Sequence, residues 1–138
     1  MNKVVIVFFV MTSIICDKYN GTTLTGNWKL IRYHSLTMGT QESEPSNIPR
    51  SIVIEFLDDG HTGKMKGHTV TNTVEGEYEL SEGNKMKTLS FGGTKIGEPI
   101  WGHRFWNAIY SATSYERNTN KLFIFFNGGG EKMEFKKQ

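Results

Sequence analysis

Residues 75–91, EGEYELSEGNKMKTLSF, carry the clearest β-hairpin pattern in the chain. In the first half, glutamates alternate with glycine, tyrosine and leucine, so one face of the strand is acidic and the other is mostly apolar. Residues 81–84 include glycine and asparagine, which favour a turn, and the chain then returns as a second strand. We predict that Tyr78 lies opposite Met86, because this register also opposes glutamates and lysines. The opposed pairs are Glu79 with Lys85 and Glu77 with Lys87.

The rest of the chain beyond Leu24 repeats this pattern of short strands separated by turns. A bulge is expected near Thr88, where the apolar alternation changes face. Residues 35–49 contain two prolines and little apolar sequence, and they are predicted to form a long loop. The remaining predicted strands cover residues 25–34, 51–57, 61–71, 114–117, 121–126 and 131–136.

One segment late in the chain has helical periodicity. Apolar residues recur at helical spacing behind Pro99, at Trp101, Phe105, Ala108, Ile109 and Ala112. Pro99 can begin a helix, because the first turn does not need its missing N–H group. We therefore predict one helix at about residues 99–112, with an apolar stripe that packs on a sheet or across a barrel mouth. The predicted fold class is mainly β (α+β): a curled antiparallel sheet or small barrel with one helix.

The N-terminus has the pattern of an export signal. A short positive start ends at Lys3, an unbroken apolar run continues to Met11, and small residues follow. The run is shorter than the roughly 20 apolar residues that a transmembrane helix needs; the alternative is a buried first strand. We predict a signal peptide over residues 1–15, a polar tether over 16–23 and one domain over 24–138.

Cys16 is the single cysteine and directly follows this signal. It stands where a bacterial lipoprotein carries its acylated cysteine, and acylation would tether the domain to a membrane through lipid chains. Ile15 and Ser13 depart from the usual lipoprotein pattern, so an ordinary cleaved signal stays open as the alternative. Both interpretations predict an exported protein of the cell envelope: an outer-membrane lipoprotein, or otherwise a periplasmic or secreted protein.

Composition and motifs argue against catalysis, metal binding and nucleic-acid binding. The formal net charge is +2 and the basic residues are scattered along the chain, which gives no strong field for nucleic acid. The four histidines lack zinc-site spacing, and neither a nucleophile motif nor a phosphate-binding glycine loop is present. We therefore predict a non-enzymatic protein without metal or cofactor, and we expect a monomer.

Carboxylates gather at two places in the sequence. Glu75, Glu77 and Glu79 could hold calcium, but we interpret them as a solvated outer face paired with Lys85 and Lys87. The segment Asp58-Asp59-Gly60 lacks the closing glutamate of a calcium loop and is predicted to be a hairpin turn.

Four aromatic residues are candidates for a ligand or partner surface: Trp28, Trp101, Trp106 and Tyr110. The three tryptophans could line a ligand cavity, although core packing is the usual role of such residues. Trp28 is expected on the same strand face as Leu30 and Arg32. Trp106 lies off the apolar stripe of the helix, so we expect it to be the most exposed of the three.

From Leu24 to Lys136 the order of these features resembles the META domain, the family that includes HslJ-type bacterial envelope proteins. The residues that carry the resemblance are Leu24-Thr25-Gly26-Asn27-Trp28-Lys29-Leu30, Ile54-Glu55-Phe56 before Asp58-Asp59-Gly60, Asn72 with Gly76-Glu77-Tyr78, Thr94, Phe105, Ile109, Tyr115, Asn120-Lys121-Leu122 and Met133-Glu134-Phe135. Many members carry a cysteine before the asparagine, where this chain has Thr71. The resemblance implies a β-rich fold with a flanking helix on an exported protein. It implies no established catalytic residues. We predict a non-catalytic domain of the bacterial cell envelope that acts by protein contacts or has a structural or stress-related role.

Two other functions stay open besides an envelope domain that acts by protein contacts: a ligand carrier and a protease inhibitor. Gly26-Asn27-Trp28 also matches the start of lipocalins, whose barrels bind small apolar ligands, but the polar, glycine-interrupted residues 63–72 argue against a ligand-holding barrel. A secreted protease inhibitor could use residues 35–49 as its reactive segment. The expected partner is therefore an unknown protein or a small apolar ligand, and a membrane is reached only through a lipid anchor on Cys16.

Overall fold

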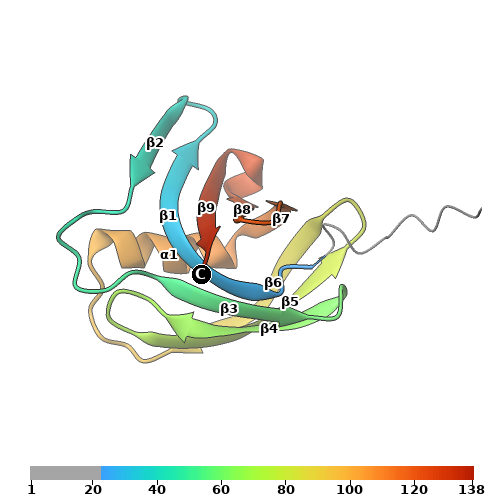
Figure 1. Ribbon diagram of the computed structural model, residues 1–138, viewed down its shortest axis with the longest axis horizontal. Coiled ribbons are helices and arrows are strands. Elements are labelled where there is room, and N and C mark those ends of the chain that lie inside the picture. The colour runs from blue at the N-terminus through green and yellow to red at the C-terminus, as the bar shows by residue number, and fades with distance from the viewer. Residues whose placement is uncertain (1–22) are drawn as a thin grey trace, which may run out of the picture.

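The computed structural model describes residues 23–138, in which an antiparallel sheet curls into a barrel and one α-helix packs against it (Figure 1). The predicted mainly β fold class with a single helix is confirmed. The predicted signal peptide, Cys16 and all but the last residue of the tether lie outside the described residues. The elements are β1 (Gly26–Ser35), β2 (Thr40–Ser43), β3 (Val53–Asp58), β4 (Thr62–His68), β5 (Thr73–Ser81), β6 (Lys85–Gly93), α1 (Ile100–Tyr110), β7 (Ala112–Arg117), β8 (Lys121–Phe126), the short 3-10 turn η1 (Asn127–Gly129) and β9 (Glu131–Lys137).

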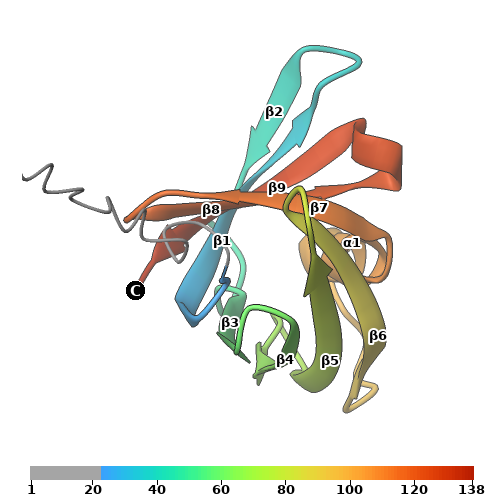
Figure 2. The same ribbon diagram turned by 90° about the vertical axis from the view of Figure 1, so that its right-hand side faces the viewer.

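Eight strands close the barrel. The sheet order runs β1-β3-β4-β5-β6-β7-β8-β9, and β9 pairs back with β1, where Leu30 lies opposite Phe135. The strand β2 pairs with the end of β1 and projects from the barrel as a hairpin (Figure 2). Within the described chain, no helix is long and apolar enough to cross a bilayer.

Aromatic and aliphatic side chains fill the inside of the barrel. On β3, Ile54 and Phe56 are buried, whereas Glu55 and Leu57 are exposed, as the alternation of a strand requires. The ring of Phe56 meets Tyr78 edge-on at 5.6 Å between centroids, and it meets Phe135 at 6.4 Å. The large, fully buried side chains include Trp28, Tyr33, Phe56, Tyr78, Phe105 and Phe135.

Helix α1 covers a seam that the strands leave open. Within the described chain, β6 and β7 share one register pair, Lys85 with Ser114. The helix lies beside the rest of β6, where the hydroxyl of Thr88 donates to the carbonyl of Ile109 at 2.6 Å. The predicted apolar stripe is confirmed as the buried face of α1, except that Ala112 begins β7 instead.

The β5–β6 hairpin has a different register from the one predicted. Tyr78 lies opposite Thr88 and Met86 lies opposite Leu80, so the prediction was wrong by two residues. A two-residue shift keeps every side chain on its own face, and the local pattern therefore could not separate the two registers. The predicted bulge near Thr88 is confirmed, because Leu89 is the additional residue at the register change.

Two other expectations were wrong in part. Residues 35–49 are not one long loop, because β2 forms within them and pairs with β1. A bulge at Ile31 in β1 exchanges the inward and outward positions of the side chains that follow it. Arg32 therefore does not share the inner face of Trp28, and Tyr33 points inward with 1% of its surface exposed.

We predict that Phe56→Ala lowers the free energy of unfolding by about 3–5 kcal/mol, because it removes a fully buried ring between Tyr78 and Phe135. Urea denaturation followed by circular dichroism measures this change. The matched control is Leu57→Ala at the next position, which is 61% exposed and should change the free energy by no more than about 0.5 kcal/mol. Equal effects of the two substitutions would contradict the inward and outward assignment of β3.

Candidate functional site

The four aromatic candidates separate into two groups. Trp28 and Trp101 belong to the core, with 0% and 3% of their surface exposed. The indole N–H of Trp28 donates to the carbonyl of Leu24 at 2.9 Å, and the ring of Trp101 packs edge-on against Tyr33 at 4.7 Å. These two tryptophans do not form a surface.

Trp106 and Tyr110 lie together at the seam between α1 and β6. Their rings are 4.9 Å and 5.9 Å from the ring of Phe91, measured between centroids. Trp106 is partly buried against the core, whereas Tyr110 is 56% exposed and its hydroxyl donates to the carbonyl of Phe91. The outer surface that they contribute is therefore small.

The buried hydroxyls of Tyr33 and Tyr78 both have hydrogen-bond partners. The hydroxyl of Tyr33 donates to the carbonyl of Trp101 at 3.0 Å, and the hydroxyl of Tyr78 donates to Asp58 Oδ2 at 2.7 Å. Burial raises the pKa of both tyrosines far above the usual value, so each stays a protonated donor at neutral pH. The indole N–H of Trp101, by contrast, is buried without a hydrogen-bond partner.

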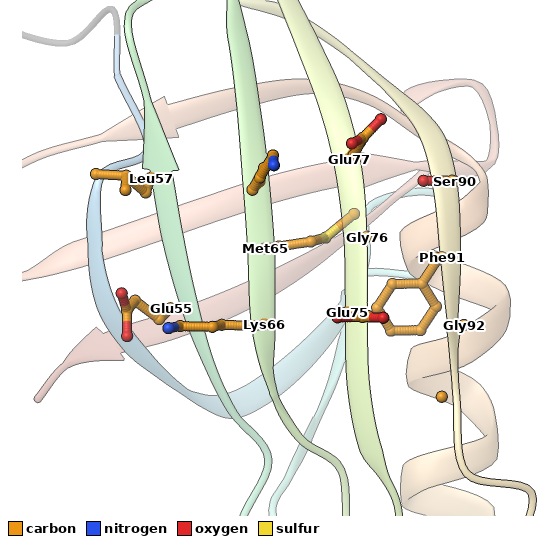
Figure 3. Close-up of a pocket in the computed structure, with 12 residues that line it drawn as sticks. Glu55, Leu57, Met65, Lys66, Glu75, Gly76, Glu77, Ser90, Phe91 and Gly92 are labelled. Atoms are coloured by element: carbon orange, nitrogen blue, oxygen red, sulfur yellow. The ribbon is translucent and has the colours of Figure 1, made fainter.

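A hollow of about 710 Å³ lies on the outer face of the sheet formed by β3 to β6 (Figure 3). Outward side chains from these four strands line it in two cross-strand rows. One row holds Glu55, Lys66, Glu75 and Gly92, and the other holds Leu57, Lys64, Glu77 and Ser90. Two neighbouring hollows of about 590 and 510 Å³ share these side chains, so the depression extends along the same strands. We call this region the outer hollow.

Glycines let the strands beneath the outer hollow approach closely. A Cβ atom on Gly76 would lie 2.3 Å from the carbonyl oxygen of Ser90, and one on Gly93 would lie 2.0 Å from that of Thr73. Neither position accepts a side chain without displacing the neighbouring backbone. Glycine in a strand interior is typical of such tight bends, which here bring β5 against β6.

Opposite charges face each other across the strands of the outer hollow. Glu75 lies opposite Lys66, and Glu77 lies opposite Lys64. The glutamates thus form an exposed face opposite lysines, but both predicted pairs with β6 were wrong. Glu79 lies opposite Lys87 instead of Lys85, and Glu77 lies opposite Ser90 instead of Lys87. Within residues 23–138, no three His, Cys, Asp or Glu side chains are arranged to hold a metal ion.

The turn Asp58-Asp59-Gly60 beside the outer hollow is confirmed. Oδ1 of Asp59 accepts hydrogen bonds from the backbone N–H groups of Thr62 at 2.8 Å and His61 at 2.9 Å. These bonds hold the pKa of Asp59 below its usual value. The carboxylates of Asp58 and Asp59 thus accept hydrogen bonds from the backbone, and that of Asp58 also accepts one from Tyr78.

A second polar cluster joins the β4–β5 loop to the segment before α1. Oε1 of Glu98 accepts hydrogen bonds from the Thr69 hydroxyl at 2.7 Å, the Thr71 N–H at 2.8 Å and the Asn72 amide at 3.1 Å. Burial opposes ionisation of Glu98, but the hydrogen bonds from Thr71, Thr69 and Asn72 outweigh it and hold the pKa below the ordinary 4.5. Asn72 is buried and also bonds the backbone of Ile96 through both ends of its amide. The cluster ties one end of the barrel to the helix.

The sequence contained a signal for some of these residues and none for others. Lys64 and Lys66 flank the buried Met65, and this period of two would have placed both lysines on the outer face. Glu98 has no local signal, because Asn72 and Thr69 lie 26 and 29 residues away from it in the chain.

No protein-family model matches this chain, and no curated protein matches it. Solved structures with a similar fold include a protein from Burkholderia xenovorans determined by NMR, with a TM-score of 0.64, 20% identity, and coverage of 82% of this chain and 81% of that chain. They also include a DUF4847 family protein from Bacteroides vulgatus, with a TM-score of 0.61, 18% identity, and coverage of 83% and 94%. At these identities the likeness shows the fold alone. The resemblance to the META domain therefore stays a prediction.

We predict that Glu98→Gln lowers the free energy of unfolding by about 1–2 kcal/mol at pH 7, because the amide accepts the three hydrogen bonds more weakly than a carboxylate does. The folded-state pKa of Glu98 is depressed, so its contribution is present above about pH 4.5 and is lost as the pH falls through the folded-state value. Urea denaturation at several pH values should show the two proteins converging below that pH. Glu82→Gln, in the exposed β5–β6 turn, serves as the control and should leave the free energy unchanged. A difference that stays constant down to acid pH would contradict the assignment.

Proposed function

We propose that this barrel is a non-catalytic binding domain of the bacterial cell envelope, and that it contacts a protein partner through the outer hollow on β3 to β6. One observation carries the proposal: side chains fill the inside of the barrel, whereas the described hollows lie on its outer face.

The filled interior favours an outer binding surface. A barrel of eight strands is just wide enough either to be filled by side chains or to hold one small ligand. Here the ring of Phe56 packs against those of Tyr78 and Phe135 in the interior, and Phe126 approaches Tyr33 at 6.4 Å between ring centroids. A ligand would have to displace these rings.

The outer hollow has the composition of a protein interface. Interfaces combine apolar contacts with a polar rim, and here Leu57 and Leu89 are 61% and 50% exposed beside the opposed lysines and glutamates. Residues 90–93 of β6 border the hollow on one side, and α1 lies against β6 beyond them. An extended peptide could therefore lie along the hollow and contact its side chains.

The envelope location depends on the sequence that precedes the barrel. The apolar run ending at Met11 is typical of an export signal, and Cys16 stands where a lipoprotein is acylated. The resemblance of residues 24–136 to META domains supports the same location and a role in protein contacts. The partner would then be an envelope or extracellular protein.

Photo-crosslinking tests this proposal in the cells that produce the protein. A p-benzoyl-phenylalanine at Gly92, where an added Cβ meets no atom within 4 Å, should give a light-dependent protein adduct. The double substitution Leu57→Ser and Leu89→Ser should weaken that adduct at least several-fold, because it removes both exposed apolar anchors. The same photoreactive residue at Glu116, exposed on β7, is the matched control and should give no such adduct. Adducts at both positions, or none at Gly92, would contradict the proposal.

A lipocalin-like ligand carrier is the second candidate, and one observation favours it. The buried, unpartnered indole N–H of Trp101 could donate to a polar group of a bound molecule. Titration with the apolar dye N-phenyl-1-naphthylamine separates the candidates. We expect no saturable fluorescence increase from a filled barrel, whereas a stoichiometric increase that Trp101→Phe weakens would favour the carrier.

A further inference from the structure

The outer face formed by β1, β9 and β8 gathers basic residues that are far apart in the sequence. Lys29 of β1 lies directly opposite Lys136 of β9, and Lys136 lies directly opposite Lys121 of β8. Three lysines thus form one row across three strands. The next rows add Arg32 and Lys132, and we call these five cations the basic face.

Like charges at directly opposed positions destabilise a sheet. Lys29 is 3.5 Å from Glu44 and Lys121 is 3.2 Å from Glu134, so two members of the row have a carboxylate beside them. Lys136 between them is exposed. Five cations and three nearby carboxylates, those of Glu44, Glu134 and Glu116, leave this face positive.

The carboxylate of Glu134 lies at the centre of the basic face and contacts the cationic side chains around it. The Glu134 side chain is 4% exposed and contacts Arg32 at 2.9 Å, His34 at 2.8 Å and Lys121 at 3.2 Å. Burial would raise the pKa of Glu134, but the hydrogen bonds from His34 and Lys121 outweigh it and keep the carboxylate ionised. This negative charge holds the cations in position and is not presented to a partner.

An exposed apolar tip adjoins the basic face. Strand β1 continues beyond Arg32 and His34 into the projecting β1–β2 hairpin (Figure 2). At its tip Leu36 is 49% exposed and Met38 is 76% exposed. On the other side of the face, Lys132 Nζ lies 4.5 Å from the ring centre of Phe123, which is partly exposed on β8.

We propose that the basic face and the hairpin tip together bind the surface of a bilayer that contains anionic phospholipid. Lysine and arginine near such a surface attract its phosphate groups, and apolar side chains at the edge of a basic face enter the headgroup region. A soluble polyanion would explain the lysine row but would leave Leu36 and Met38 without a role. The proposal uses different strands from the outer hollow and stands independently of the proposed function.

Sedimentation with lipid vesicles tests this inference on the full chain carrying Cys16→Ser, so that no acyl chain contributes. The protein should pellet with vesicles of phosphatidylcholine and phosphatidylglycerol and stay in solution with phosphatidylcholine alone. The triple variant Lys29→Gln, Lys121→Gln and Lys136→Gln should lower the partition coefficient on the order of a hundredfold, since each lysine near an anionic surface contributes about a fivefold change. The variant Lys136→Gln alone, with a fall of about fivefold, keeps the test independent of the folding of the triple variant.

The matched control removes the same charge from other strands and loops: Lys85→Gln, Lys87→Gln and Lys95→Gln, all exposed. This control should bind as the unsubstituted protein does, whereas Leu36→Gln with Met38→Gln should bind several-fold more weakly. An equal loss in the lysine control, pelleting with phosphatidylcholine alone, or unchanged binding of the lysine-row and tip variants would overturn the proposal. Retention on heparin without binding to vesicles would also overturn it, in favour of a soluble polyanion. A failed crosslink at Gly92 would not affect any of these results.

Discussion

Pairing between the first and last strands is the constraint on which the rest of the structure depends. β1 pairs with β9 from Trp28 to Ser35, and it also pairs with β3 at its start and with β2 at its end. The bulge at Ile31 lies between the parts that pair with β3 and with β2, so that Trp28 and Leu30 before it and Tyr33 after it all face inward. Without this pairing, β1 and β9 would each present an unpaired edge and the apolar interior would be open to solvent.

Closure is less complete on the other side of the barrel, and α1 compensates for it. One register pair joins β6 to β7 in the described chain. Phe105 of α1 packs on Phe91 of β6 at 5.8 Å between ring centroids, so the helix replaces side-chain contacts that a longer strand pair would supply. The Glu98 cluster then fixes the start of this helix against the β4–β5 loop. Gly102 fits the same arrangement, because a Cβ there would lie 2.0 Å from Glu98 Oε2.

Local periodicity was enough to predict most of the strands, the helix and most of the buried faces, because each depends on neighbours within a few residues. It failed in β1 beyond Ile31, where the bulge turns Tyr33 inward in place of Arg32. It also failed for the register of the β5–β6 hairpin, since a slip of two residues leaves both faces intact and still places Glu79 opposite a lysine. It failed again at β2, whose four exposed residues have no apolar alternation and are ordered by pairing with β1. The lysine row and the Glu98 cluster depend on contacts between distant parts of the chain. No local pattern contains them.

Cross-strand pairing also explains why the two outer faces should recognise different partners. On β4 and β5, glutamates lie opposite lysines, so opposite charges alternate across the outer hollow. The proposed binding there relies on shape and apolar contact. On β1, β9 and β8, lysine faces lysine, and the compensating charge has to come in part from outside the sheet. A bilayer supplies such charge over a broad area without specific geometry, whereas a protein partner must fit the outer hollow. The two proposals thus assign a membrane and a protein partner to different strands of the same barrel.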